Sequence, residues 1–359
     1  MNVTSGGGRT YIFDCETLFA FAVGTEMGDG PVFLTFAPWA AQPPSQPWGL
    51  NFFVPRSIPV IAVVGKQNHW WHTAAIWQLA DVVRKHVASR PLILYGTSLG
   101  AYGALHLRNA FDAAYGFAIA PQVSVSPEVA SGDGRWLKDR ALIELQFDEL
   151  SNLRMQRATC CVFLDPFDAS DRYQYELHSP IDKLDSPGGI ALVPIPHFTH
   201  GAAIHLARSK LIAPLLVEAA RGRFPDVSEV RPQFGEAYKL VPKPFFNYLR
   251  RSEKILERDV ALFRQHLDAS TTFDYEAAYM ASEVFLKLED RHEAMKWSDR
   301  SIVRVLEQYG RISSDAACKH LRTLKRARGI EAARAWWEPL DNVHKSAAAE
   351  AFYRKYIIV

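Results

Sequence analysis

Short apolar runs recur along the first two hundred positions of the chain, and segments with helical periodicity separate most of them. The runs at 58–64 and 91–95 are apolar almost throughout, which is typical of strands that are buried on both faces. A glycine follows each of these two runs directly, as expected where a strand ends. Strands are predicted at 11–13, 18–23, 32–36, 58–64, 91–95, 117–120, 159–164 and 190–195.

The segments between these runs follow the spacing of amphipathic helices. Apolar residues recur there every three or four positions, most clearly at 73–89 and 99–110. Further helices are predicted at 137–153, from 171 onward and at 201–221. Because a crossover helix joins parallel strands, the alternation predicts an α/β fold, a mostly parallel sheet with helices on both faces.

The character of the chain changes after about residue 225. Prolines at 225, 232, 242 and 244 punctuate a stretch that resembles a linker, and the pattern beyond it is helical. We therefore predict an α/β domain over 1–225 and an all-α domain over 245–359, joined by a linker at about 225–245.

Small and large residues alternate within 274–307 at a spacing that lets two antiparallel helices approach closely. The positions concerned are Ala278, Tyr279, Leu286, Leu288, Asp290, Glu293, Ala294, Trp297 and Ser301. This pattern resembles a tetratricopeptide repeat. A weaker copy spans 315–337, and a further unit is expected at 252–267. The resemblance implies a surface for a protein partner or for self-association.

Composition and charge narrow the function classes. The 359 residues are 48% hydrophobic and 22% charged, with a net charge of +2, so the chain has no general attraction to nucleic acid. No apolar run approaches the roughly 20 residues that span a bilayer. Residues 1–8 carry no basic or apolar leader. We therefore expect a cytoplasmic protein without membrane or nucleic-acid partners.

The cysteines do not indicate a metal site. They stand at 15, 160, 161 and 318, without CxxC or Cys–His spacing. His69 and His72 could form a ligand pair, but no third ligand accompanies them. We expect neither a metal nor a cofactor.

The strongest chemical signal is the sequence GTSLG at 96–100, between the strand at 91–95 and the helix at 99–110. So tight a turn strains its central residue, exposes that side chain and leaves no room for a Cβ two positions to either side. The motif, its context and the order of elements over about 9–220 resemble the α/β-hydrolase superfamily. The resemblance implies that Ser98 is a nucleophile.

In that superfamily an acid and then a histidine follow the nucleophile along the chain. The histidine precedes the last helix of the domain, where the sequence PHFTHG at 196–201 matches. We assign His200 as the general base, with His197 as the alternative. His205 is expected one turn into the helix, pointing elsewhere.

Three aspartates follow the strand at 159–164 and are candidates for the acid. The superfamily acid stands a few residues beyond the strand end, which favours Asp168. Asp165 would serve if the loop folds back, and Asp171 is otherwise expected to cap a helix. The acid's task is to orient the histidine and to stabilise its cation.

Two backbone N–H groups are expected to bind the oxyanion that forms during acyl transfer. One belongs to Leu99, directly after the nucleophile. The other lies in the loop after the third strand, where Ala37 or Trp39 can donate and Pro38 cannot, and we assign Ala37. The chain has no HGGG sequence, so neither the lipase nor the esterase subgroup is assigned.

Aromatic and polar residues gather on loops expected at the carboxyl edge of the sheet. Trp39, Trp70 and Gln122 are the candidate substrate contacts, and Asp133, Arg135 and Trp136 belong to the same cluster as Gln122. Aromatic faces beside polar groups suit a sugar or another ring with polar edges.

Together these features predict a serine hydrolase that works through an acyl-enzyme, an esterase for a small or carbohydrate-linked acyl ester. The same residues would serve an acyltransferase with an alcohol or amine acceptor. A different class of function is a non-catalytic scaffold that acts through the helical repeats. The retained serine, histidine and acid candidates argue against a scaffold and favour a small-molecule acyl substrate.

Overall fold

The computed structural model describes residues 8–26, 28–182, 189–269, 273–340 and 347–358. The chain divides into two compact units, Met1–Ala237 and Tyr238–Val359. The division lies inside the proline-punctuated stretch at 225–245, but helices occupy most of that stretch. Helix α9 (Val227–Gly235) belongs to the first unit and α10 (Pro242–Arg251) to the second.

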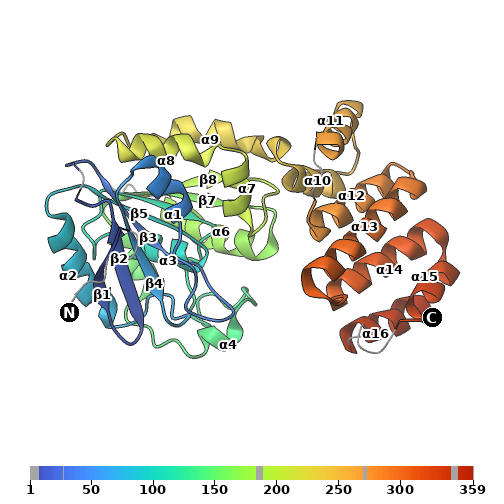
Figure 1. The fold of residues 1–359 in the computed structure, drawn as a ribbon, viewed down its shortest axis with the longest axis horizontal. Coiled ribbons are helices and arrows are strands. Elements are labelled where there is room, and N and C mark those ends of the chain that lie inside the picture. The colour runs from blue at the N-terminus through green and yellow to red at the C-terminus, as the bar shows by residue number, and fades with distance from the viewer. Residues whose placement is uncertain (1–7, 27, 183–188, 270–272, 341–346, 359) are drawn as a thin grey trace. The chain divides into compact units, whose positions relative to one another are not determined.

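An eight-stranded sheet forms the centre of the first unit (Figure 1). The strands are β1 (Arg9–Asp14), β2 (Leu18–Val23), β3 (Val32–Phe36), β4 (Val60–Gly65), β5 (Leu92–Thr97), β6 (Tyr115–Ile119), β7 (Thr159–Leu164) and β8 (Ile190–Pro194). Their order in the sheet is β1-β2-β4-β3-β5-β6-β7-β8. β2 pairs antiparallel with β1 and β4, and the remaining neighbours are parallel. This is the arrangement of the α/β-hydrolase fold, as predicted.

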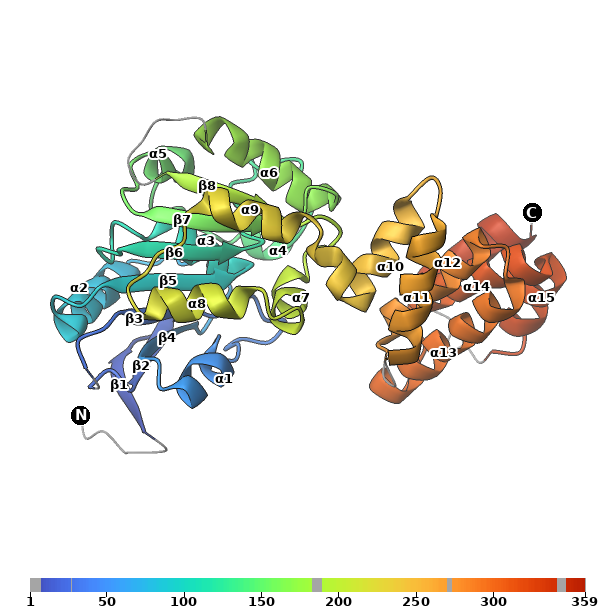
Figure 2. The same ribbon diagram turned by 90° about the horizontal axis from the view of Figure 1, so that it is seen from above.

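Helices cover both faces of this sheet (Figure 2). Besides α9 they are α1 (Leu50–Phe53), α2 (Ala75–Val87), α3 (Leu99–His106), α4 (Leu137–Arg140), α5 (Glu149–Arg154), α6 (Ala169–Asp182), α7 (Ala202–Arg208) and α8 (Ile212–Ala220). α2 and α3 share one core cluster with Phe36 of β3. On the opposite face Phe33 packs against Phe53 of α1, with ring centroids 4.4 Å apart. Cover on both faces explains why the central strands are apolar at nearly every position.

Two of the predicted helices are interrupted. The segment 137–153 contains only the short helices α4 and α5, and 201–221 is divided between α7 and α8. Lys210, between α7 and α8, has a φ of 60°, which no continuous helix contains. Pro214 lies in the first turn of α8, where its missing N–H costs nothing, so the chain begins a new helix there.

The regular elements described in the second unit are helical: α10, α11 (Glu257–Ala269), α12 (Tyr275–Lys287), α13 (Arg291–Tyr309), α14 (Ser314–Arg328), α15 (Ile330–Trp337), α16 (Ala347–Tyr353) and a terminal turn of π-helix. Asp274, Asp290 and Ser313 cap helices, each accepting from the N–H three residues on. Successive helices from α12 to α15 pack on one another. α12 and α13 span the predicted repeat at 274–307, and α14 and α15 span 315–337.

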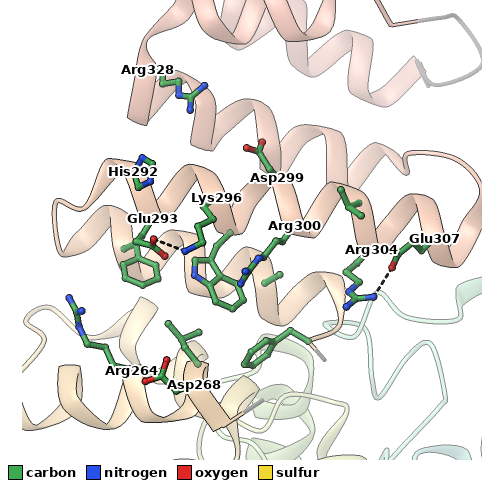
Figure 3. Close-up of a pocket in the computed structure, with 16 residues that line it drawn as sticks. Arg264, Asp268, His292, Glu293, Lys296, Asp299, Arg300, Arg304, Glu307 and Arg328 are labelled. Carbon is green, nitrogen blue, oxygen red and sulfur yellow. Dashed lines mark hydrogen bonds and ion pairs between the residues drawn. The ribbon is translucent and has the colours of Figure 1, made fainter. Parts of the chain in front are cut away.

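A groove of about 1120 Å³ lies between α11 and α13 of the second unit. Figure 3 shows charged side chains along α13, with Arg264 and Asp268 of α11 on one side and Arg328 of α14 on the other. Two ion pairs close within α13, Lys296 with Glu293 at 2.8 Å and Arg304 with Glu307 at 2.7 Å. Because the groove contains both signs of charge and part of that charge is already paired, it offers little net attraction to a partner of either sign.

Among the described helices, none is long and apolar enough to cross a membrane. Residues 1–7, most of the segment in which a leader was sought, lie outside the described residues.

Helix α3 lies directly on the backbone of β3. A Cβ at Gly100 would overlap the carbonyl oxygen of Phe36, and one at Gly103 would come within 2.8 Å of the indole of Trp71. At Gly100 the obstacle is backbone, so no side chain can move aside to make room. Glycine at this position therefore sets how closely the helix approaches the sheet.

Gly100→Ala should lower the free energy of unfolding by about 3 kcal/mol, because the added methyl group meets backbone atoms that cannot relax. Gly235→Ala is the matched control, since a Cβ there meets nothing within 4 Å. We expect the control to change stability by less than about 1 kcal/mol. Urea unfolding followed by tryptophan fluorescence measures both, and equal midpoints would contradict the close contact.

Candidate active site

Ser98 occupies the turn between β5 and α3 with a φ of 53° and a ψ of −122°. This conformation is strained for a residue other than glycine, and hydrogen bonds on both sides hold it. The Ser98 N–H donates to Ile119 O at 2.9 Å, and the Tyr102 N–H donates to Ser98 O at 3.0 Å. A Cβ at Gly96 would overlap the carbonyl of Gly100, so the turn cannot be built with larger residues. It is the strained strand-to-helix turn that the GTSLG sequence predicts.

His200 reaches Ser98 from the turn between β8 and α7. Ser98 Oγ and His200 Nε2 are 3.0 Å apart, which is hydrogen-bond distance. The buried carboxylate of Asp165 secures this turn by accepting from the N–H groups of His197 at 3.0 Å and Thr199 at 2.6 Å. Both of those residues have positive φ values, 68° and 60°, so the carboxylate stabilises a strained backbone. The ring of His197 stacks on a phenylalanine instead of facing Ser98.

The carboxylate beside His200 is that of Asp171, and the assignment of Asp168 to this position is corrected. His200 Nδ1 and Asp171 Oδ1 are 2.9 Å apart, and the Asp171 side chain is fully buried. Asp168 accepts from the N–H groups of Ser170 at 3.2 Å and Asp171 at 3.1 Å, which makes it the cap of α6. The helix begins at Ala169, earlier than predicted, so its first turn directs Asp171 toward the histidine.

Arg135 is a further partner of this carboxylate. Its Nη1 lies 2.8 Å from Asp171 Oδ1 and 2.9 Å from His200 Nδ1. Asp133 holds the guanidinium from its other side, accepting from Nε at 2.8 Å and from Nη2 at 2.7 Å. Burial by itself would raise the pKa of Asp133, but the hydrogen bonds and charge of Arg135 hold that pKa below its usual value. The imidazole thus stands beside a row of carboxylate, guanidinium and carboxylate.

One of the two predicted oxyanion donors is available. The N–H of Leu99 is the first in α3 and has no acceptor within the helix. The N–H of Ala37 donates to Val63 O at 3.0 Å, because pairing between β3 and β4 extends one residue past the strand. The assignment of Ala37 is therefore corrected. Of the alternatives weighed, Trp39 has an N–H that makes no hydrogen bond with the described residues.

Two of the three predicted substrate contacts are buried and pack behind the site. Trp70 is 0% exposed and Gln122 2%, and the indole N–H of Trp70 donates to Gln122 Oε1 at 3.0 Å. Trp39 is half-buried, and its ring lies 6.5 Å from that of Trp136, which lies 5.4 Å from the ring of His200. Trp39 and Trp136 are therefore partly exposed aromatic residues on the histidine side of the site.

A buried polar network supports α3 behind Ser98. The Tyr102 hydroxyl donates to Glu149 Oε1 at 2.6 Å, and the Ser124 hydroxyl and Val125 N–H donate to the same carboxylate. His72 Nε2 lies 2.7 Å from the Tyr102 hydroxyl. Burial opposes ionisation of Glu149, but its hydrogen-bond donors outweigh burial and lower its pKa to about 2. The ionised carboxylate therefore ties α3 to α5.

Comparisons with known proteins give distant structural likenesses and no family. No protein-family model and no curated protein matches the chain. Similar solved structures include the capsule O-acetyltransferase of Neisseria meningitidis serogroup A, at 13% identity and a TM-score of 0.41 over 57% of this chain and 95% of that one. An esterase of Rhizomucor miehei has 15% identity and a TM-score of 0.41 over 62% and 83%. The acylaminoacyl peptidase of Pyrococcus horikoshii has 11% identity and a TM-score of 0.44 over 62% of this chain and 43% of that one.

Two contacts of the site escaped the sequence reasoning. Aspartate is a favoured N-cap, so Asp168 could have been the cap as well as Asp171, and a cap at Asp168 places Asp171 in the first turn of the helix. The sequence places Arg135 in the predicted cluster of aromatic and polar residues near the site. No local pattern connects it to Asp171, which lies 36 positions further along the chain.

Glu149→Gln should lower the free energy of unfolding at pH 7 by about 3 kcal/mol. The folded-state pKa of about 2 lies below the ordinary 4.5. The stabilisation is therefore complete above the ordinary value and is lost as pH falls toward the folded one. Urea unfolding of both proteins at pH 7 and pH 3 measures the difference. It should shrink at pH 3 to less than half, whereas an equal difference at both pH values would contradict the assignment.

Proposed function

We propose that the chain is a serine hydrolase in which Ser98, His200 and Asp171 form a catalytic triad. The observation that carries the proposal is the unbroken line of contacts, 3.0 Å from Ser98 Oγ to His200 Nε2 and 2.9 Å from His200 Nδ1 to Asp171 Oδ1. Such a triad is recognised by these contacts and not by sequence position. The chain order serine, aspartate, histidine agrees with the α/β-hydrolase order.

In the first half of the reaction Ser98 Oγ attacks the acyl carbonyl carbon, and His200 Nε2 takes the hydroxyl proton. Asp171 accepts from Nδ1–H, so the Nε2 lone pair faces the serine, and it stabilises the imidazolium that forms. The N–H of Leu99 donates to the developing oxyanion. His200 then returns the proton to the leaving oxygen, and an ester of Ser98 with the acyl group remains.

In the second half water attacks this ester and gives a proton to His200, which returns it to Ser98 Oγ as the carboxylic acid leaves. We propose an acyl ester of a small molecule or carbohydrate as the substrate. The half-buried rings of Trp39 and Trp136 near His200 support this class, because aromatic faces accommodate a sugar ring. An alcohol that replaces water would make the same residues an acyltransferase, and the products distinguish the two.

A fluorophosphonate should label the protein at Ser98, and Ser98→Ala should abolish the label. Hydrolysis of p-nitrophenyl acetate and of acetylated sugars should fall by about 10³-fold or more in the same variant. Peptide mapping by mass spectrometry identifies the labelled residue. The exposed Ser89→Ala serves as the matched control and should behave as the wild type. A folded wild type that is not labelled at Ser98 would refute the proposal.

The acid is tested by comparing two aspartates of the same loop. Asp171→Asn should slow labelling by about 10³-fold or more, because asparagine cannot hold the required histidine tautomer. Asp168→Asn should leave the labelling rate within about twofold, because asparagine caps helices nearly as well as aspartate. Second-order labelling rates at pH 7 measure both effects. The opposite ranking would return the role to Asp168.

A further inference from the structure

Arg135 occupies a position that a serine, histidine and aspartate triad does not require. Its Nη1 completes a triangle with Asp171 Oδ1 at 2.8 Å and His200 Nδ1 at 2.9 Å, two atoms that are themselves 2.9 Å apart. The side chain of Arg135 is 19% exposed and that of Asp171 is 0% exposed, so little water screens their charges. A positive charge therefore contacts the histidine nitrogen that faces away from Ser98.

His200 Nδ1 thus has two neighbours of opposite character. The ionised carboxylate of Asp171 can only accept, so its bond to Nδ1 requires a proton on that nitrogen. The guanidinium of Arg135 can only donate, so it acts on a protonated Nδ1 through its charge alone. Once Nδ1–H faces Asp171, the guanidinium disfavours a second proton on the ring.

Arg135 is held on both sides and cannot turn away. Asp133 accepts two hydrogen bonds from the guanidinium, and Gln174 Nε2 donates to Asp133 Oδ2 at 3.0 Å. The guanidinium carbon lies 4.8 Å from the ring centroid of Trp136. A planar fork bound in this way has one orientation, unlike the flexible ammonium of a lysine.

Three other titratable groups lie near His200, and each of them has a different place or role. Asp165 accepts from the backbone of the turn that holds His200, and Asp168 caps α6. His205 lies within α7. Among the described residues, Arg135 is the cation that contacts His200.

We propose that Arg135 is a positioning residue: it holds Asp171 as the acceptor for Nδ1–H, and its charge disfavours a second proton on the ring of His200. This role rests on the proposed function, because it requires His200 to act as a base. Without the cation, the ring should take up its proton at higher pH. Without the carboxylate of Asp133, the charge of Arg135 is less compensated, and the ring should take up its proton at lower pH.

The experiment follows the protonation of His200 directly, by NMR titration of the full-length protein labelled with ¹³C-histidine. His200→Gln identifies the signal. The midpoint should move up by about one pH unit in Arg135→Gln and down by about half a unit in Asp133→Asn. Lys138→Gln is the matched control, since it removes an exposed cation of α4, and should leave the midpoint unchanged.

The pH dependence of fluorophosphonate labelling is recorded on the same variants and should shift in the same directions. Arg135→Lys keeps the charge without the fork, so its midpoint should stay near that of the wild type while the plateau rate falls about tenfold. It replaces Arg135→Gln if near-ultraviolet circular dichroism shows that variant to be unfolded.

Midpoints that move the same way in Arg135→Gln and Asp133→Asn indicate a merely structural role and overturn the proposal. An unchanged midpoint in a folded Arg135→Gln does so too. If Arg135→Gln does not fold, Arg135→Lys is measured in its place. A midpoint that lies about one pH unit from that of the wild type then overturns the proposal. A wild type that is not labelled at Ser98 refutes the proposed function instead, and the NMR midpoints then still decide whether Arg135 controls the protonation of His200.

Discussion

Direct backbone contact between α3 and β3 is the constraint on which the site depends. Gly100 leaves the helix close enough to the sheet that no Cβ fits against the carbonyl of Phe36. This contact places Ser98 at the carboxyl edge of the sheet, where the turns after β7 and β8 also end. Parallel strands bring these turns to one edge, so residues distant in sequence reach the same serine. Tyr102 and its buried network secure the same helix from behind.

Three aspartates within seven positions of one loop have three different structural roles. Asp165 bonds to the turn that holds His200, Asp168 starts α6, and Asp171 contacts the histidine from the first turn of that helix. Each role depends on where the helix begins, because a helix shifted by one residue turns its side chains by about 100°. The cap at Asp168 therefore decides which carboxylate meets His200, although it touches neither Ser98 nor the histidine.

Buried charge in the first unit is compensated by specific partners. Asp171, Arg135 and Asp133 form a continuous row, and Glu149 is surrounded by hydroxyl and N–H donors. An ion removed from water without such partners would shift to its neutral form or destabilise the fold. These partners come from separate segments, so satisfying the buried groups also determines how the loops around the site are arranged.

The amino-acid sequence alone determined the strands, the strained turn at Ser98 and the choice of His200, because burial on both faces and a tight turn leave local marks on composition. It did not determine which carboxylate lies beside His200, since the choice between Asp171 and Asp168 depends on the residue at which α6 begins. The tertiary structure decided three other contacts. They are the hydrogen bond from the Ala37 N–H to β4, the pairing of Trp70 with Gln122 and the contact of Arg135 with Asp171. Each is a hydrogen bond between segments far apart in the chain, and a polar group takes whichever partner the fold brings to it.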